Sequence, residues 1–169
     1  IATLYTQIET MMVDGTTHFS IQDITSNYAN PNDNTKFLFL VQCSRSESHE
    51  IVRHRPASYM QASQRYIRYG EKNPYMVCVG TEQEKKLMSK IKDTLIGVFD
   101  KYISLLKDKH KAEDARVILP NCTETKIFIY ADKKEYRHFS RMRQSVFAYP
   151  PVKEVFDSVY FTLINKKFI

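Results

Sequence analysis

The pattern of apolar and polar positions changes its period several times along the chain, and each change predicts a different element. The longest regular stretch runs from Glu82 to Lys109, where apolar residues recur every three or four positions and charged residues fill the rest. This spacing predicts one long amphipathic helix with an apolar stripe facing the core. The stripe consists of Leu87, Ile91, Leu95, Val98, Tyr102 and Leu105. We expect its role to be structural.

Two short segments have the character of strands. Residues 36–43 are almost continuously apolar and lie between turn-forming residues, which is typical of a strand buried in a sheet. Residues 125–130 are rich in β-branched and aromatic side chains and predict a second strand of the same sheet. Residues 57–70 are polar and aromatic without a clean period, and they predict a loop that carries functional groups.

Capping residues predict where shorter helices begin. Ser44 is followed three residues later by a glutamate, which is a capping box, so a helix should start here and end near Arg53. Asp132 has a glutamate at the same spacing and predicts a helix that continues through Arg143. Further helices are expected over residues 1–12, 112–118 and 152–163.

The mixture of helices and strands lacks regular βαβ repetition and predicts an α+β domain. A length of 169 residues suits a single domain over residues 1–169. The chain has neither an 18-residue apolar run nor a signal-peptide pattern, so we expect a cytoplasmic protein without a membrane span. Cys43, Cys78 and Cys122 are too far apart for a zinc set, and we expect free thiols and no metal.

The net charge of +6 indicates an anionic partner, such as a nucleotide, a phosphorylated cofactor or a nucleic acid. Arginines gather in residues 53–66, RHRPASYMQASQRY, where they alternate with hydroxyl and aromatic side chains. The guanidinium fork suits phosphate, and tyrosines can stack on flat rings. The segment therefore predicts a site for a phosphorylated aromatic ligand, with a basic surface loop as the alternative interpretation.

The segment RHRPASYMQASQRY resembles the signature of flavin-dependent thymidylate synthases, which runs Arg-His-Arg, two residues, Ser, a variable stretch, Ser, one residue and Arg-Tyr. Three more segments resemble the same family in the same order along the chain. They are FLFLVQCSRSESHEIVRHR, EDARVILPNCTETK and DKKEYRHFSRMR. The resemblance spans residues 37–143 and implies the thymidylate synthase-complementing protein fold, an α+β fold with a mostly antiparallel central sheet flanked by helices.

The resemblance implies reductive methylation of dUMP to dTMP, with methylenetetrahydrofolate as carbon donor, FAD as hydride carrier and NADPH as reductant. It also implies a homotetramer whose active sites are shared between subunits. No protein nucleophile is implied, so we interpret Ser63 as a hydroxyl that holds a ligand. Two alternatives stay open: an FAD- or nucleotide-binding homologue with little turnover, and a basic nucleic-acid-binding module. The second leaves the order of the four segments unexplained.

The resemblance further implies roles for single residues. Positions that match FAD contacts are Arg53, His54, Arg55, Asp132, Lys134 and His138. Positions that match dUMP contacts are Glu50, Arg53, Gln61, Ser63, Arg65, Arg116 and Arg143. Arg143 matches the catalytic arginine that touches the uracil and favours ionisation of its N3, since a fixed cation lowers the pKa of a nearby acid.

Three of these positions depart from the family pattern. Glu50 stands where the family usually has glutamine; a carboxylate accepts hydrogen bonds but cannot donate them, and we expect it to pair with Arg53 one turn later. Asp132 replaces an asparagine, and Lys134 replaces an arginine and loses its bidentate fork. These departures bear on turnover rather than on fold or ligand class.

Overall fold

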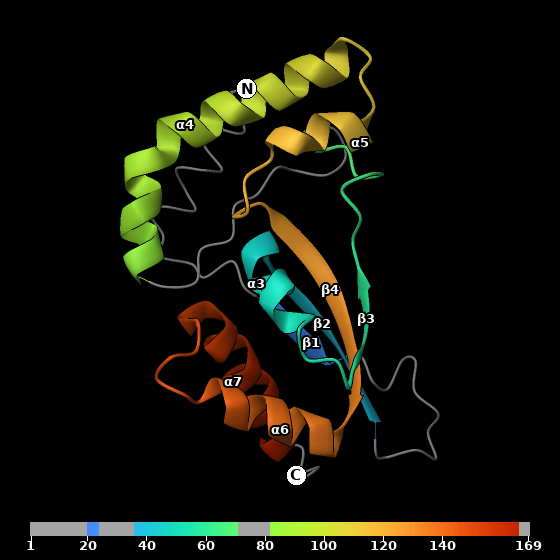
Figure 1. Ribbon diagram of the computed structural model, residues 1–169, viewed down its shortest axis with the longest axis vertical. Coiled ribbons are helices and arrows are strands. Elements are labelled where there is room, and N and C mark those ends of the chain that lie inside the picture. The colour runs from blue at the N-terminus through green and yellow to red at the C-terminus, as the bar shows by residue number, and fades with distance from the viewer. Residues whose placement is uncertain (1–19, 24–35, 71–81, 166–169) are drawn as a thin grey trace.

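The computed structural model describes residues 20–23, 36–70 and 82–165, which form a sheet with helices around it (Figure 1). The elements are β1 (Ser20–Asp23), β2 (Lys36–Ser44), α3 (Arg45–Ile51), β3 (Ser58–Gln61), α4 (Glu82–Lys107), α5 (Ala112–Ala115), the 3₁₀ turn η1 (Arg116–Ile118), β4 (Glu124–Asp132), α6 (Lys133–Arg143) and α7 (Pro150–Asn165). The helix predicted over residues 1–12 and Cys78 lie outside the described residues.

The sheet has the strand order β1-β2-β4-β3, and every neighbouring pair is antiparallel. Strands β2 and β4 form its centre and pair along nine residues, from Lys36 opposite Asp132 to Ser44 opposite Glu124. Buried and partly exposed residues alternate along both strands, because α3, α6 and α7 pack on one face. The predicted α+β fold with an antiparallel sheet flanked by helices is therefore confirmed.

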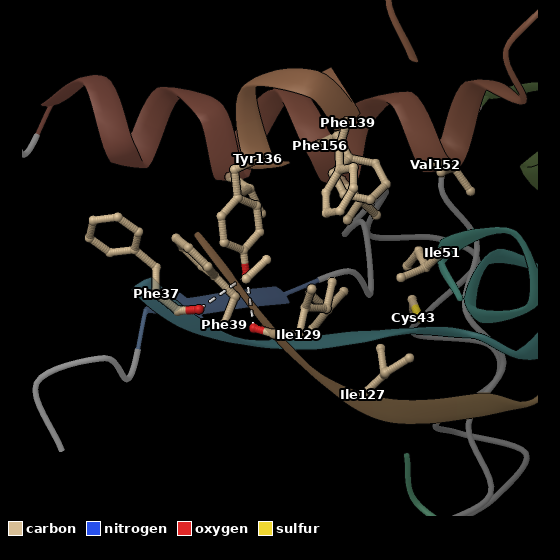
Figure 2. Close-up of a cluster of buried hydrophobic side chains, with 14 of the residues drawn as sticks. Phe37, Phe39, Cys43, Ile51, Ile127, Ile129, Tyr136, Phe139, Val152 and Phe156 are labelled. Carbon is tan, nitrogen blue, oxygen red and sulfur yellow. Dashed lines mark hydrogen bonds between the residues drawn. The ribbon is translucent and has the colours of Figure 1, made fainter. Parts of the chain in front are cut away.

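The main core lies between the sheet and the helix pair α6–α7 (Figure 2). Tyr136 on α6 is completely buried, and its hydroxyl donates hydrogen bonds to the carbonyl oxygens of Ile129 at 2.8 Å and Phe37 at 3.4 Å. Its ring also meets Phe39 edge-on at 5.3 Å. These contacts fix α6 against the two central strands, so the side chains at the end of this helix occupy defined positions.

Both predicted helix starts are confirmed. The hydroxyl of Ser44 accepts a hydrogen bond from the Glu47 N–H at 3.2 Å, and the Glu47 carboxylate accepts one from the Ser44 N–H, which completes the capping box. Asp132 accepts a hydrogen bond from the Glu135 N–H at 2.8 Å and caps α6. The caps at Ser44 and Asp132 satisfy backbone donors that the first turn of a helix leaves free.

A second core lies where α4 packs on α5 and η1, and it corrects the predicted stripe. Leu95 and Tyr102 are buried as expected, but Leu87 is 52% exposed. Met88, Phe99 and Leu106 take the buried positions that were predicted for Leu87, Val98 and Leu105. Adjacent helix residues differ by roughly 100° around the axis, so at these three places the buried face is shifted by one position from the predicted stripe.

Other boundaries differ from the predictions. Part of the predicted loop over residues 57–70 is strand β3, which pairs with β4 through contacts such as Tyr59 with Ile129. Strand β1 was not predicted, and α3 ends at Ile51, before Arg53. Helix α7 starts at Pro150 rather than at residue 152, because proline fits the first turn of a helix.

The expected helix over residues 112–118 is present as α5 continued by η1. Cys43 and Cys122 form no disulfide within the described residues, and burial together with the nearby Glu47 raises the pKa of Cys43. None of the described helices is both long and apolar enough to cross a membrane. The described residues also contain no cluster of three histidine, cysteine or acidic side chains arranged to hold a metal ion.

Candidate functional site

Arg143, the last residue of α6, contacts the end of α3 and the residues just after it, about 90 positions away in the sequence. Its Nε donates a hydrogen bond to His54 Nε2 at 3.0 Å. Its Nη2 donates to the carbonyl oxygen of Glu50 at 3.1 Å, and both terminal nitrogens lie 3.4 Å from one oxygen of the Glu50 carboxylate. The Arg143 side chain is only 14% exposed. Its guanidinium is therefore a largely buried cation held by several acceptors.

The imidazole of His54 is neutral at neutral pH. Burial, followed by the charges of Arg143 and His138, lowers its pKa from 6.5 to about 4. The ring lies between Phe139 at 4.5 Å and Phe156 at 5.2 Å. Because a guanidinium can only donate, Nε2 of His54 accepts and the ring proton sits on Nδ1. The histidine thus orients Arg143 without adding charge.

Tyr59 on β3 secures the same segment. Its hydroxyl donates a 2.7 Å hydrogen bond to the backbone carbonyl oxygen of His54. Burial raises the pKa of the Tyr59 phenol, so the hydroxyl stays protonated and remains a donor. Strand β3, which the sequence analysis did not identify, therefore helps to fix the position of His54.

Glu50 does not form the expected ion pair with Arg53. Its carboxylate pairs with Arg143, while the side chain of Arg53 is exposed. The reason is tertiary: packing of α6 brings the buried guanidinium to the end of α3, where it also takes the carbonyl oxygen of Glu50. A carboxylate at this position offsets part of the charge of Arg143.

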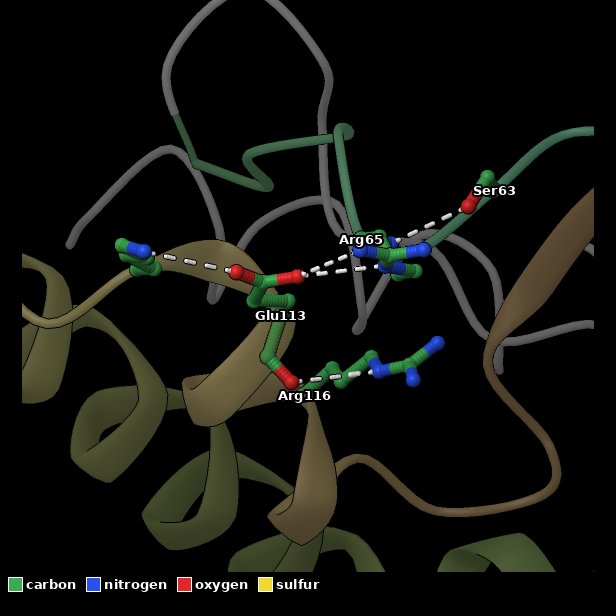
Figure 3. A network of polar contacts seen from close by, with 5 residues as sticks. Ser63, Arg65, Glu113 and Arg116 are labelled. Carbon is green, nitrogen blue, oxygen red and sulfur yellow. Dashed lines mark hydrogen bonds and ion pairs between the residues drawn. The ribbon is translucent and has the colours of Figure 1, made fainter.

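A second group of polar residues surrounds Glu113 on α5 (Figure 3). One carboxylate oxygen of Glu113 accepts from Arg65 Nε at 3.1 Å and Nη2 at 2.9 Å, and the other lies 3.6 Å from the Lys111 ammonium. Arg116 Nε donates to the backbone oxygen of Glu113 at 3.2 Å. The hydrogen bond from Arg65 lowers the pKa of Glu113. Glu113 thus contacts every other residue of this group that has been named: Arg65, Lys111 and Arg116.

Three residues predicted for dUMP therefore lie together: Ser63, Arg65 and Arg116. The Ser63 hydroxyl accepts a hydrogen bond from the backbone N–H of Arg65 at 3.3 Å. The arginine side chain is 51% exposed, so its remaining donors face solvent. Glu113 carried no predicted role, although its place at the start of the EDAR segment is the signal that could have identified it.

Gln61, the fourth residue of β3, lies between α3 and β4. Its side-chain amide donates to the Ser48 hydroxyl at 2.7 Å and to the Thr125 hydroxyl at 3.3 Å. Ser48 is on α3, two residues before Glu50, so the predicted Gln61 lies close to the helix that carries the first group. No hydrogen bond or ion pair within the described residues joins the Arg143 group to the Glu113 group.

The residues predicted for FAD lie mostly along α6 and the turn before β3. Lys134 and His138 line a cavity of about 490 Å³, whose other lining residues are Pro56, Glu135, Arg137 and Arg141. Arg53 and Arg55 are exposed in the segment that leads to Pro56, and His54 is buried between them. Asp132 caps α6 and thus has a structural role in this chain.

The fold and these groups define an α+β protein whose basic clusters suit anionic ligands. The family model described as thymidylate synthase complementing protein matches residues 4–166. The match covers nearly the whole sequence, and the chain belongs to this family.

Several relatives are named flavin-dependent thymidylate synthase. The protein from Geobacter sulfurreducens is 37% identical over 113 residues, which cover 66% of this chain and 49% of that relative. The one from Pyrococcus abyssi is 34% identical over 127 residues, covering 73% and 52%, and the one from Corynebacterium glutamicum is 31% identical over 132 residues, covering 70% and 53%. The chain spans about half the length of the curated relatives it matches.

Proposed function

We propose that this chain carries out reductive methylation of dUMP to dTMP, with methylenetetrahydrofolate as carbon donor, FAD as cofactor and NADPH as reductant. Family membership and the relatives' name support this activity. The observation that carries the proposal is the meeting of Arg143 with His54 and Glu50, since it joins the first and last family-like segments in one group.

The residues present fit a flavin dinucleotide. The cavity beside α6 presents Lys134 and His138 to a diphosphate, and its size lies within the range of roughly 300–1,000 Å³ usual for ligand sites. Arg53 and Arg55 are exposed in the segment that leads to Pro56, which also lines the cavity. A methylene group needs two electrons to become a methyl group, and bound FAD would carry them from NADPH to the one-carbon unit.

Arg143 would act on the pyrimidine. Its guanidinium is held in one orientation by His54 Nε2 and the carbonyl oxygen of Glu50. A cation fixed beside uracil N3 lowers the pKa of that N–H and stabilises negative charge on the ring. Neutral His54 holds the guanidinium plane without competing for the anion, so the charge of Arg143 remains available.

Ser63, Arg65 and Arg116 would hold the phosphate of dUMP. Arg65 offers a planar fork of donors, and the Ser63 hydroxyl can donate to the same oxygens. Glu113 keeps the arginine in place until the ligand arrives. Because this ion pair is exposed, a phosphate can displace the carboxylate or share the guanidinium with it at little cost.

We also propose a homotetramer with shared active sites. The Glu113 group lies on α5, before β4 begins, whereas Arg143 lies on α6, after β4 ends (Figure 1). No hydrogen bond or ion pair within the described residues joins the two groups. A nucleotide site that uses both groups would be completed by residues from another copy of the chain.

A second function has a specific observation in its favour. Glu50 places a carboxylate against Arg143, and a compensated cation stabilises a developing anion less well. The chain would then bind FAD and nucleotide with little synthase turnover.

The test is tritium release from 5-labelled dUMP by the purified, FAD-loaded chain with NADPH and methylenetetrahydrofolate. The proposed activity predicts release that depends on all three additions. Bound FAD and dUMP without release would support the second function, and failure to bind either ligand would reject both.

A further inference from the structure

The solvent-facing side of α6 has a regular arrangement of basic side chains. Lys134, Arg137, His138 and Arg141 follow the spacing i, i+3, i+4, i+7 and therefore share one face of the helix. The opposite face, with Tyr136 and Phe139, is buried in the core. The basic face lines the 490 Å³ cavity, together with Glu135 and Pro56.

This face has an excess of available positive charge. Lys134, Arg137 and Arg141 are basic side chains, and Glu135 is the single acidic residue in the cavity lining. Within the described ranges, none of these three cations forms an ion pair, unlike Arg65, which is bound to Glu113. Their donors are thus free for an incoming anion.

The cavity adjoins the candidate active site. Pro56 follows His54 by two residues, and His138 in the cavity lining is close enough for its charge to contribute to the lowered pKa of His54. A ligand held along α6 would therefore reach toward the group around Arg143. A helix face whose only role is contact with solvent would not require a cavity, and it would not require a position close to His54.

We propose that Arg137 and Arg141 bind a phosphate monoester, namely the 2′-phosphate that distinguishes NADPH from NADH. A phosphate monoester carries about −1.5 to −2 charges at pH 7, which two arginines can balance. Residues four apart on a helix have Cβ atoms about 5–6 Å apart, so both forks can converge on one phosphate. Arginine is also the residue that accommodates this phosphate in other dinucleotide sites. The inference rests on the proposed function, in which NADPH is the reductant.

Two other phosphates could use the same chemistry, and each makes a different prediction. The dUMP phosphate is also a monoester, but Ser63, Arg65 and Arg116 already form a separate group suited to it. The FAD diphosphate consists of diesters with one charge each, which Lys134 can hold beside His138. Arg137 and Arg141 are left for a third anion.

The test compares the double variant Arg137→Gln/Arg141→Gln with the unsubstituted chain. Binding of 2′,5′-ADP and of 5′-AMP is measured by isothermal titration calorimetry, without any need for turnover. Loss of two charge-assisted contacts predicts 2′,5′-ADP binding weaker by about 10- to 100-fold and unchanged 5′-AMP binding. In the FAD-loaded chain, the NADPH-over-NADH preference in flavin reduction should fall by a similar factor.

The matched control is Lys101→Gln/Lys107→Gln, which removes two exposed cations from α4 and should change neither preference. Equal weakening of both adenine nucleotides, or a parallel loss in the control, would indicate general charge attraction and overturn the inference. Loss of FAD or of dUMP binding in the double variant would assign the arginines to those ligands and overturn it as well.

The proposed function can fail separately. An unsubstituted chain that prefers 2′,5′-ADP but releases no tritium from dUMP would retain the phosphate site and reject the synthase activity. A chain that releases tritium but binds 2′,5′-ADP no better than 5′-AMP would retain the synthase activity and reject the 2′-phosphate site.

Discussion

Arg143 and Arg65 are both arginines assigned to dUMP, yet the protein holds them in opposite ways. Arg143 is 14% exposed and contacts a neutral ring, a backbone carbonyl oxygen and a carboxylate. Arg65 is 51% exposed and depends on one carboxylate, that of Glu113. A buried cation with fixed partners suits stabilisation of charge at a defined atom, whereas an exposed ion pair can exchange its partner for a ligand. The difference suggests catalysis at Arg143 and capture at Arg65.

The largest effect is expected from Arg143→Ala. Removing a fixed donor from the reacting atoms should lower kcat by about 10²- to 10³-fold. Tritium release from 5-labelled dUMP measures the rate, and FAD absorbance with thermal unfolding serves as the control for folding. A rate within tenfold of the unsubstituted chain would place the chemistry elsewhere.

His54 should make stability depend on pH. Its pKa of about 4 lies below the usual 6.5, so the unfolded chain binds a proton over this interval while the folded chain does not. Folding stability from neutral His54 is thus fully present above pH 6.5 and is lost as the pH falls toward 4, by up to about 3 kcal/mol. Urea unfolding at pH 7 and pH 4.5 measures it, with His54→Asn as the reference. Equal pH dependence of the two proteins would contradict this.

Arg65→Gln should weaken capture rather than chemistry. We expect the KM for dUMP to rise by about 10- to 100-fold with little change in kcat, since a charge-assisted contact to phosphate is lost. Deoxyuridine, which lacks the phosphate, provides the control ligand because its weak binding should not change. A fall in kcat at saturating dUMP would show that the two arginines do not divide the work in this way.

The smallest effect is expected from Glu50→Gln. An amide leaves the charge of Arg143 uncompensated and can donate a hydrogen bond, so kcat should rise by about two- to tenfold. Asp100→Asn on α4 removes a distant exposed carboxylate and should leave kcat unchanged. An unchanged rate in Glu50→Gln would mean that this departure does not limit turnover.

Lys134→Arg, which restores a bidentate fork on α6, should improve FAD retention.

Local signals predicted the elements that local chemistry defines. The capping box at Ser44, the N-cap at Asp132 and the apolar run of β2 each depend on neighbours within a few residues, and all three are present in the structure. Strand β3 has only four residues and no clear alternation, and it exists because β4 offers a pairing edge. Such an edge is not visible in the sequence of the shorter strand.

The candidate site shows the same distinction between features that local sequence predicts and features that depend on tertiary packing. The motif spacing indicated which residues to consider, but the pairing of Glu50 with Arg143 crosses 93 positions and depends on how α6 packs. The spacing of residues about one helical turn apart favoured Arg53 as the ion-pair partner of Glu50. Tertiary packing brings Arg143 to Glu50 instead. The organising role of Glu113 was missed for a similar reason, because Arg65 reaches it across 48 positions.

Strand β4 and helix α6 share a junction without a spacer: Asp132 ends the strand and caps the helix that begins at Lys133. One inserted residue there would turn α6 by roughly 100° relative to the sheet. The turn would carry Arg143 away from His54 and swing the basic face away from Pro56 in the same movement. The junction should therefore tolerate substitutions that keep the cap but no change of length, whereas the loop between Arg143 and Pro150 should accept insertions.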